Sequence, residues 1–490
     1  MKYKKSNLVA YRQDLSFLPN ENRVITKLFG LDKVRIYKVF DRILKMTESA
    51  SSDLLKNVIA SFENRHKNIK RLFKDNFDQI NGNLDITIYN ELPLEKKLLI
   101  GSFFTLEYSI ESAALFNPSV VPHPNQNNTK KGEKKVIISF RAVGEGHMSS
   151  IVFRSGILDK NGDIKMDKMS HLVEKANNIE TAEYLKKNFA MKLKDIGKYD
   201  LIKGILDQLL DEFTFDELLI SIAQFKEVTA MTVEHDRAID TLHWLAQSNY
   251  EVEFDDNIDI TERVIFPRST TDIRAIEDAR FVHFTEDKKN PVYYATYTAY
   301  NGFSILPQLI ETKDFCRFKV CTMMGVGSQN KGMALFPEKI NGKYAMISRN
   351  DSENMFIMFS DDINFWVEPK LLREPKFDWE FIQIGNSGSP LKTERGWLLL
   401  THGVGPVRIY TIGALLLDLK DPTKIIGEIK EPILIPEQDE RNGYVPNVVY
   451  SCGAIVHNEY LVLPYAASDS RSSIVKYKLN ELLDKMTPVE

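Results

Sequence analysis

The chain has 490 residues, of which 43% are hydrophobic and 27% are charged, and its formal net charge is -4. A chain of this length is too long for one compact core, so we expect two or three structural units. The charge balance argues against a dominant role in binding nucleic acid, which usually requires a basic face, and no stretch has the apolar length that a membrane span requires.

Residues 1–112 are predicted to form a mostly helical region. Between Val34 and Phe77, apolar residues recur at spacings of three and four, as on one face of an amphipathic helix. Ser51, Ser52 and Asp53 are typical N-cap residues and predict a break between two helices. This region has few groups suited to chemistry, so we expect it to pack or to make subunit contacts, and it could support a homo-oligomer.

A strand-rich segment begins near Phe116. The stretches V-I-I-S-F-R-A-V and S-S-I-V-F-R-S-G predict two strands that are joined at G-E-G-H. From about residue 168 to residue 248 the apolar spacing is helical again. We therefore expect a helical insertion between strand-rich segments.

From Val264 to Leu482 the chain is predicted to consist of short strands and turns, repeated with a period of about fifty residues. Two units contain similar hairpins, K-I-N-G-K-Y and K-T-E-R-G-W, in which a glycine turn precedes the aromatic residue that starts the return strand. Four units here and the strand pair near Ser139 make five. The prediction is a mainly β protein: a five-bladed β-propeller over residues 113–490, with the N-terminal helices and the helical insertion after blade one. A pair of β-sandwiches and a six-bladed propeller are the alternatives.

Three cysteines, Cys316, Cys321 and Cys452, are too few and too scattered for a disulfide framework or a zinc cluster. Free buried thiols are typical of a reducing compartment. The N-terminal stretch has positive charge but lacks the apolar segment of a secretory signal peptide. We therefore expect a cytoplasmic protein, and the dispersed histidines predict no metal site.

Polar residues recur near the ends of the apolar strands, where the inner strands of successive blades would reach the central channel of a propeller. Each residue alone has a simpler explanation, such as a turn acid, a surface ion pair or a buried histidine. Their recurrence in successive units predicts a ligand site that combines acids with cations. The set consists of Arg141, Asp278, Lys331, Arg349, His402 and Asp469.

Several motifs together resemble glycoside hydrolase family 130. In chain order they are I-E-D-A-R, G-M-A-L-F-P-E-K-I-N-G-K-Y, G-W-L-L-L-T-H-G-V, G-A-L-L-L-D-L-K-D-P and Y-A-A-S-D. That family consists of β-mannoside phosphorylases and β-1,2-mannosidases with a five-bladed propeller. The resemblance covers Asn117 to about Tyr477 without the helical insertion, and the N-terminal helices resemble a longer subgroup.

The resemblance implies a role for each member of the set. Asp278 stands where the family has its general acid, whose proton reaches the glycosidic oxygen through the mannose 3-hydroxyl, with inversion at the anomeric carbon. The residues implied to hold the sugar in the cleavage subsite, or to lie beside it, are Asn117, Arg141, Asp469 and Lys331. Inorganic phosphate would be held by Arg349 and His402.

Phosphorolysis and hydrolysis require different partners for the acid. Hydrolysis with inversion needs a carboxylate base that activates water on the opposite face of the sugar, and Glu437 is the best candidate for that base. Phosphate is already an anionic nucleophile and needs cations instead. The planar fork of Arg349 suits this task, and His402 would add a further donor.

The stretch A-I-E-D-A-R-F at residues 275–281 raises a difficulty. Residues two apart on a strand share a face, so Asp278 and Arg280 would point together while Glu277 points away. An arginine beside Asp278 lowers the pKa of its carboxyl group, which is the wrong direction for an acid. We therefore expect a bend at Ala279 that lets Arg280 pair with Glu277 instead.

Together with the resemblance, these observations predict a phosphorylase without cofactor or metal that uses inorganic phosphate as co-substrate. It would cleave β-mannosides, β-1,2-linked mannooligosaccharides in particular, and release α-mannose 1-phosphate. The first alternative is an inverting β-1,2-mannosidase, and the second is a non-catalytic propeller that binds glycans. The expected partner is an oligosaccharide substrate, with no nucleic acid and no membrane.

Overall fold

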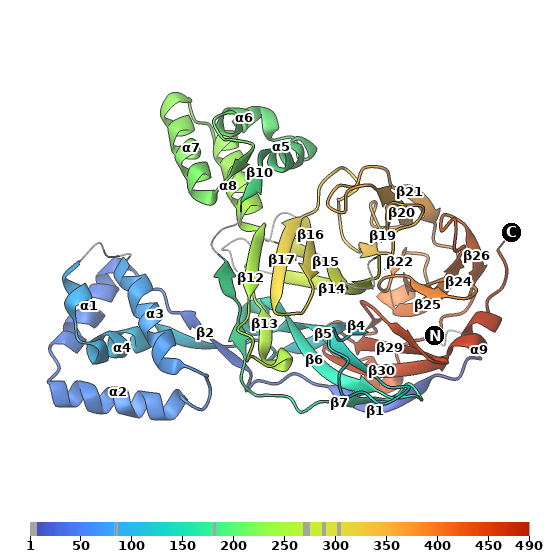
Figure 1. Cartoon of the computed structure of the whole chain (residues 1–490), viewed down its shortest axis with the longest axis horizontal. Coiled ribbons are helices and arrows are strands. Elements are labelled where there is room, and N and C mark those ends of the chain that lie inside the picture. Colours follow the sequence, from blue (N-terminus) through green and yellow to red (C-terminus); the bar gives the residue numbers. More distant parts are fainter. Residues whose placement is uncertain are drawn as a thin grey trace.

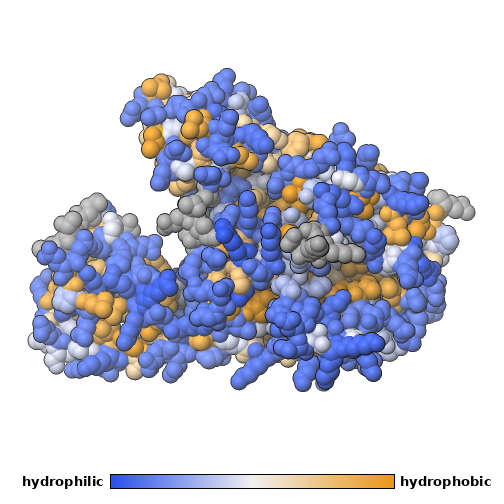
Figure 2. All heavy atoms as spheres, viewed as in Figure 1, coloured by the Kyte–Doolittle hydropathy of each residue, from blue (hydrophilic) through white to orange (hydrophobic). Residues whose placement is uncertain are grey.

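The computed structural model describes residues 7–82, 84, 87–179, 183–267, 275–286, 291–300 and 305–489. The other residues of the predicted N-terminal region and of the predicted propeller with its insertion lie outside the described residues. The chain is mainly β. Figure 1 shows a strand-rich body from which two groups of helices project. Figure 2 shows the two groups separated by open space, with hydrophilic residues predominating over this face. Within the described ranges, no helix has both the length and the apolar character needed to cross a membrane.

The first helical group, termed the N-terminal lobe, has its own hydrophobic core, with Phe40 packed against Phe77 and Phe104. Its helices are α1 (Lys33–Leu44), α2 (Glu48–Phe62), α3 (Ile69–Gly82) and α4 (Leu94–Phe103), with the short helix η1 (Thr87–Glu91). The break expected at residues 51–53 is wrong, because these residues lie inside α2. Thr47 caps that helix instead, since its hydroxyl accepts from the main-chain nitrogen of Ala50 at 3.2 Å.

The N-terminal lobe is joined to the body by a two-stranded ribbon, β2 (Val24–Leu28) and β3 (Thr105–Ser109). Residues before this ribbon differ from the expected helical region. They form β1 (Tyr11–Phe17), which pairs with a strand near the C-terminus, with Tyr11 opposite Lys476. Sequence patterns did not reveal this pairing because it joins segments from the two ends of the chain.

The second helical group, termed the insertion lobe, also encloses its own core, which includes Leu193, Ile202 and Leu242. Its helices are α5 (Lys186–Asp195), α6 (Tyr199–Asp207), α7 (Phe215–Val228) and α8 (Val233–Gln247), with the ribbon β10 (Tyr184–Leu185) and β11 (Glu212–Phe213). Lys192 ties this lobe to the body, because its Nζ donates to the main-chain oxygen of Met323 at 3.0 Å. The helices begin later than expected, since residues 174–179 contribute strands to the body.

The body contains five sheets of four or more strands among the described residues. The first sheet has the order β4 (Ala114–Pro122), β5 (Lys134–Val143), β6 (Ser149–Leu158), β13 (Arg263–Ile265) and β8 (Glu174–Lys175), with β7 (Ile164–Met166) beside β6. The second has the order β14 (Ala275–Phe284), β15 (Val292–Tyr300), β16 (Ile305–Thr312), β17 (Arg317–Thr322), β12 (Tyr250–Glu253) and β9 (Asn177–Ile179).

The remaining sheets follow in chain order. The third contains β18 (Ala334–Leu335), β19 (Tyr344–Ser348), β20 (Met355–Ser360) and β21 (Lys370–Arg373). The fourth contains β22 (Gln383–Asn386), β24 (Gly396–Val404), β25 (Tyr410–Leu417) and β26 (Ile425–Glu428), with β23 (Leu391–Thr393) beside β24. The fifth contains β1, β30 (Arg471–Lys478), β29 (Tyr460–Ala467) and β27 (Val449–Tyr450), with β28 (Ile455–His457) beside β29, and is followed by α9 (Leu479–Asp484).

Neighbouring sheets are held together by large apolar side chains. Phe153 of the first sheet lies 5.9 Å from Phe281 of the second, and Phe336 after the first strand of the third sheet lies 5.3 Å from Trp397 of the fourth, measured between ring centroids. The strand β24 is buried along its whole length, as expected for a strand covered on both faces. This packing fixes the sheets so that polar residues at strand ends can meet.

Candidate active site

Seven of the eight predicted site residues line one pocket of about 240 Å³. They are Asn117, Arg141, Asp278, Lys331, Arg349, His402 and Asp469. They lie within or next to strands of all five sheets. The pocket thus gathers acids and cations that are far apart in the sequence.

Glu437, the candidate second carboxylate, is not among the residues that line this pocket. It is the N-cap of the short helix η5 (Gln438–Glu440), where its side chain accepts from the main-chain nitrogen of Glu440. Its carboxylate also lies 3.1 Å from Arg12 of β1, and 47% of its side chain is exposed. The role of Glu437 is therefore local capping, and the structure does not bring it to the predicted site.

Asn117 and Asp278 lie at β-bulges in the first strands of the first and second sheets. Both residues have left-handed backbone, with φ of 50° for Asn117 and 55° for Asp278. The ladder register shifts between Phe116 and Ser119 in β4, and between Glu277 and Arg280 in β14. Asn and Asp adopt this conformation more readily than other side chains. A bulge re-aims side chains, and here both side chains line the pocket, where the amide of Asn117 donates to Asp278 Oδ1.

The bulge also brings Glu277 into the pocket, contrary to the expected alternation. Lys331 Nζ donates to Glu277 at 2.5 Å and Arg141 Nη2 donates to it at 3.3 Å. The expected pairing of Arg280 with Glu277 is therefore wrong. Residues on a regular strand alternate between faces, but the extra residue of a bulge breaks that alternation.

Arg280 remains beside Asp278 and is 2% exposed. Its Nη1 donates to the main-chain oxygen of Asp278 at 2.9 Å, its Nε to Asn386 Oδ1 at 3.1 Å, and its Nη2 to the hydroxyl of Tyr450 at 2.6 Å. The guanidinium thus holds the bulge to the fourth and fifth sheets.

The charges around Asp278 favour its ionised form. Burial by itself would raise the pKa of Asp278, but Arg280, Arg141 and Lys331, with the hydrogen bond from Asn117, outweigh burial and hold this pKa below its ordinary value. Asp278 is therefore ionised near neutral pH when no ligand is bound.

Asp469 behaves in the opposite way. It follows β29 in a left-handed turn, with φ of 48° at Ser468 and 49° at Asp469. Burial and the nearby charge of Asp278 raise the pKa of Asp469 to about 7, although Arg141 and Arg408 oppose the shift. The pair therefore divides its charge, with the carboxylate on Asp278 and a proton on Asp469 over much of the range below pH 7.

Arg349 and His402 form the part of the pocket that has no carboxylate in contact. Among the described residues, no acidic side chain lies within ion-pair distance of Arg349, and its buried Nε lacks a hydrogen-bond partner. His402 is 1% exposed, and its Nδ1 lies 2.9 Å from the main-chain oxygen of Asn386. Burial, Arg349 and Arg280 lower the pKa of His402 to about 3, so its ring is neutral.

Two further buried atoms at the pocket lack hydrogen-bond partners within the described part of the chain. They are Asn117 Oδ1 and Arg141 Nε. Buried polar atoms without partners carry a free-energy cost, and such atoms at a pocket are suited to a polar ligand. An acceptor and a donor on two residues that both contact Asp278 fit the hydroxyl groups of a sugar.

The prediction from sequence missed four polar residues of the pocket, Glu277, Arg408, Tyr410 and Tyr450. The stretches R-I-Y at residues 408–410 and V-V-Y at residues 448–450 stand at strand ends, as the predicted residues do. Their position at strand ends, which they share with the predicted residues, is the sequence signal that could have identified these tyrosines and Arg408 as site residues. Tyr410 and Tyr450 both lie against the ring of His402, with centroid distances of 6.0 Å and 4.9 Å.

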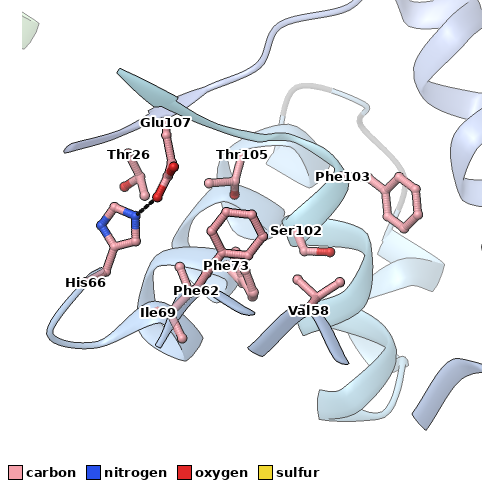
Figure 3. A pocket seen from close by; sticks show the side chains of 10 residues that line it. All are labelled: Thr26, Val58, Phe62, His66, Ile69, Phe73, Ser102, Phe103, Thr105 and Glu107. Carbon is pink, nitrogen blue, oxygen red and sulfur yellow. Dashed lines mark hydrogen bonds and ion pairs between the residues drawn. The ribbon is translucent and has the colours of Figure 1, made fainter. Parts of the chain in front are cut away.

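A second pocket, of about 410 Å³, lies in the N-terminal lobe (Figure 3). Apolar side chains such as Phe62, Ile69 and Phe73 form most of its wall, and at one end His66 bonds Glu107 at 2.8 Å. Arg65 also donates twice to Glu107. These polar groups already satisfy one another, so the charged pocket of the body is the better candidate for chemistry.

Comparisons with known proteins identify the family of this chain. The model of the family described as beta-1,4-mannooligosaccharide phosphorylase matches residues 236–488. The chain is 35% identical over 218 residues to the 1,2-beta-oligomannan phosphorylase of Thermoanaerobacter sp. (strain X514), covering 43% of this chain and 71% of that protein. It is 39% identical over 212 residues to the beta-1,2-mannobiose phosphorylase of the same organism, covering 41% and 65%.

Among solved structures, the chain is similar to the complex of the beta-1,2-mannobiose phosphorylase from Listeria innocua with beta-1,2-mannobiose. The TM-score is 0.45 and the sequence identity is 22%, over 76% of this chain and 92% of that one. The family match covers more than half of the 490 residues. The chain belongs to glycoside hydrolase family 130.

Proposed function

We propose that this protein is an inverting β-mannoside phosphorylase, which cleaves its substrate with inorganic phosphate and releases α-mannose 1-phosphate. The observation that carries the proposal is the combination, in one pocket, of Asp278 with Arg349, a cation that has no acidic partner among the described residues. An arginine in this situation is suited to an anionic substrate. We propose no cofactor and no metal, with phosphate as the co-substrate.

The proposed substrate class is β-1,2-linked mannooligosaccharides. Support comes from the similar proteins, two of which are named for 1,2-beta-oligomannan and beta-1,2-mannobiose. A more distant relative from Ruminococcus albus, 31% identical over 215 residues, is named a beta-1,4-mannooligosaccharide phosphorylase. The β-1,4 linkage is therefore the second linkage to test.

We also propose that the five sheets are the five blades of a propeller, with the insertion lobe placed after the first blade. Support comes from the pocket, which every sheet helps to line. The contributing residues, one for each sheet in chain order, are Arg141, Asp278, Arg349, His402 and Tyr450. Convergence of all sheets on one pocket is expected when blades surround a central channel.

Hydrolysis is the weaker alternative because none of the described residues that line the pocket is a suitable base. Inverting hydrolysis needs a second ionised carboxylate that can activate water. Glu277 is bound by Lys331 and Arg141, and Asp469 keeps a proton up to about pH 7. Glu437 caps a helix outside the pocket.

The role proposed for Asp278 as the acid requires a proton that it lacks in the free enzyme. Phosphate bound at Arg349 would bring negative charge into a region where Arg280, Arg141 and Lys331 keep the pKa of Asp278 low. The added negative charge would raise that pKa. Asp469, whose raised pKa keeps it protonated near neutral pH, is a nearby source of the proton. Phosphate binding would therefore prepare the acid.

A homo-oligomer formed through the N-terminal lobe stays part of the proposal. Apolar side chains are exposed on this lobe, among them Val34, Leu94 and Phe103. Light scattering of the purified protein would give its mass in solution. A monomer at all concentrations would exclude this part of the proposal without affecting the activity.

The deciding experiment is turnover of β-1,2-mannobiose with and without inorganic phosphate, with the products separated by ion chromatography. Phosphate-dependent formation of mannose 1-phosphate is the expected result. Arg349→Gln should raise the KM for phosphate by about tenfold or more, because hydrogen bonds to charged groups contribute about 1.5–3 kcal/mol. Free mannose formed at the same rate without phosphate would instead establish the hydrolase.

A further inference from the structure

The insertion lobe contacts a loop of the body that carries a residue of the pocket. This loop, termed the β17–β18 loop, comprises residues 323–333 and joins the second sheet to the third. Its first residue, Met323, accepts at its main-chain oxygen from Lys192 Nζ at 3.0 Å. The main-chain nitrogen of Gly325 donates to Asp195 Oδ2 at 2.9 Å. Lys192 and Asp195 both lie in the last turn of α5, so one helix end of the lobe holds the start of the loop.

The two side chains at this helix end are unfavourable for the lobe by itself. Lys192 is 4% exposed, and burial lowers its pKa because a buried ammonium loses its hydration. Asp195 is the last residue of α5, where its negative charge meets the negative end of the helix dipole. The hydrogen bonds to the loop offset both effects, which indicates that contact with the loop is the role of these side chains.

The β17–β18 loop is also packed closely against Trp366, which is fully buried. The main chain of Trp366 accepts from the nitrogen of Gly327 at 2.8 Å and donates to the oxygen of Met324 at 2.9 Å. A Cβ on Gly325 would come within 2.2 Å of the Trp366 oxygen, and φ at Gly325 is 87°, a left-handed conformation that suits glycine. Contacts with both α5 and Trp366 therefore define the path of the loop towards the pocket.

The far part of the loop reaches two charged groups of the pocket. Lys331 Nζ donates to Glu277 at 2.5 Å. Asn350, which follows Arg349 in the chain, donates from its Nδ2 to the main-chain oxygen of Gly327 at 2.7 Å. The loop therefore connects the insertion lobe to the cation that holds Glu277 and to the neighbour of Arg349.

We propose that Lys192 and Asp195 are positioning residues for the active site, which hold the β17–β18 loop so that Lys331 stays on Glu277. Neither residue is among those that line the pocket, so both act through the loop. The insertion lobe then supports the active site and is more than a separate helical unit. This inference rests on the phosphorylase function proposed above.

The physical basis is the population of the arranged pocket. A loop released at α5 gains conformations in which Lys331 leaves Glu277, and a substrate that needs the arranged pocket must first select it. The apparent affinity falls in proportion to the population of that state, whereas the bound complex is unchanged. Loss of the contact should therefore raise KM for the mannoside and leave kcat nearly constant.

The test of Asp195 measures kcat and KM for β-1,2-mannobiose at saturating phosphate. Asp195→Ala keeps a good helix former but loses the acceptor, so KM should rise by about tenfold. Asp195→Asn keeps an acceptor oxygen for Gly325 and should restore KM to within about threefold of the wild-type value. Asp240→Ala, at an exposed position on α8 of the same lobe, is the matched control and should behave as the wild type. An unchanged KM in Asp195→Ala, or an equal rise in Asp240→Ala, would overturn the inference.

Lys192→Met tests the second contact with the loop. Methionine fills a similar buried space but has no ammonium group to donate to Met323, so KM should rise by about the same factor as in Asp195→Ala. Lys203→Met, at an exposed position on α6, is the control. A wild-type KM in Lys192→Met would contradict the role of this residue.

A double variant shows whether the effect passes through Lys331. Effects of residues that act on one group are not additive, whereas effects of independent residues are. Asp195→Ala combined with Lys331→Met should therefore have the KM of Lys331→Met alone, to within about twofold. A KM raised by the product of the two single effects would show that Asp195 acts elsewhere and would reject the proposal.

Hydrogen exchange decides the inference without turnover, so that failure of the proposed function can be told apart from failure of the inference. Absence of turnover with and without phosphate would refute the proposed function alone. In Asp195→Ala, peptides from residues 323–333 should exchange their amide hydrogens at least about tenfold faster than in the wild type, because the loop opens more often. The same peptides should keep the wild-type rate in Asp240→Ala. Equal exchange in Asp195→Ala and the wild type would overturn the inference.

Discussion

Asn117 and Asp278 occupy the same place on neighbouring sheets and touch each other. Each is the left-handed residue of a bulge in the first strand of its sheet, and the amide of Asn117 donates to the carboxylate of Asp278. Ser119, two residues after Asn117, strengthens the link because its hydroxyl accepts from the main-chain nitrogen of Phe281 at 3.1 Å. The two bulges therefore act as one unit that holds the proposed acid.

The first prediction concerns the acid itself. Asp278→Asn should fold normally, because asparagine tolerates left-handed backbone as well as aspartate does. Its turnover should fall by at least about a hundredfold, since general acid catalysis contributes this much or more. The measurement is the rate of mannose 1-phosphate formation. Asp361→Asn is the control, since Asp361 is an exposed turn acid paired with Lys343; equal rates in the two variants would remove Asp278 from the mechanism.

The second prediction separates the effect of the left-handed backbone at Asn117 on stability from the effect of its side-chain amide on activity. Asn117→Gly keeps the left-handed backbone but loses the amide, so kcat/KM should fall by about tenfold with little loss of stability. Asn117→Ala should lose the same activity and also destabilise the fold by about 1–2 kcal/mol, the cost of left-handed backbone in a residue with a Cβ. Steady-state kinetics and urea unfolding measure the two effects. Wild-type activity in Asn117→Gly would show that the amide has no part in positioning Asp278.

The third prediction concerns Arg280, which contacts Asp278, Asn386 and Tyr450 at once. Arg280→Lys keeps the positive charge but cannot reproduce the planar set of guanidinium hydrogen bonds to these three residues. Its kcat should therefore fall, while the pKa of Asp278 stays low. Arg280→Gln also removes the charge, and the pKa of Asp278 should rise. The loss of one partner of a buried charge pair costs about 3–5 kcal/mol, so Arg280→Gln should unfold at lower temperature.

The pH dependence of unfolding distinguishes the two Arg280 variants. Because the folded-state pKa of Asp278 is depressed, the stability from this group is present above its unfolded pKa of about 3.9 and is lost as pH falls through the folded value. In Arg280→Gln, where the folded-state pKa of Asp278 lies closer to the unfolded value, this loss should be smaller and should be complete at a higher pH than in Arg280→Lys. Arg317→Gln, which breaks an exposed ion pair with Glu251, is the control. Identical acid profiles for the two Arg280 variants would contradict the electrostatic role.

The fourth prediction concerns Asp469, whose pKa in the folded state is raised to about 7. A raised pKa means that the folded protein binds the proton more tightly than the unfolded chain does. The resulting stability is fully present below the unfolded pKa of about 3.9 and is lost as pH rises through about 7. Asp469→Asn should remove this dependence, so its melting temperature should fall less than that of the wild type between pH 5 and pH 8. Parallel melting curves for the two proteins across this range would show that Asp469 has an ordinary pKa.

Local patterns in the sequence were sufficient for most of the strands and for six residues of the pocket, while the seventh, Asn117, was indicated by the family resemblance. Strand ends are marked by short-range alternation and turn residues, and polar residues such as Arg141 and His402 stand out there against apolar neighbours. The helical lobes were also visible, because apolar spacing is a local property of the chain. Membership of glycoside hydrolase family 130, first indicated by motifs, agrees with the family match over residues 236–488.

Tertiary structure alone decided how these groups are paired. The bulge at Asp278 turned Glu277 towards Lys331 and left Arg280 on Asp278, and β1 joined β30 from the opposite end of the chain. Glu437 caps the short helix η5 and does not line the pocket. Ion pairing, burial and protonation depend on distances between residues that are remote in sequence, and those distances exist only after the sheets have packed.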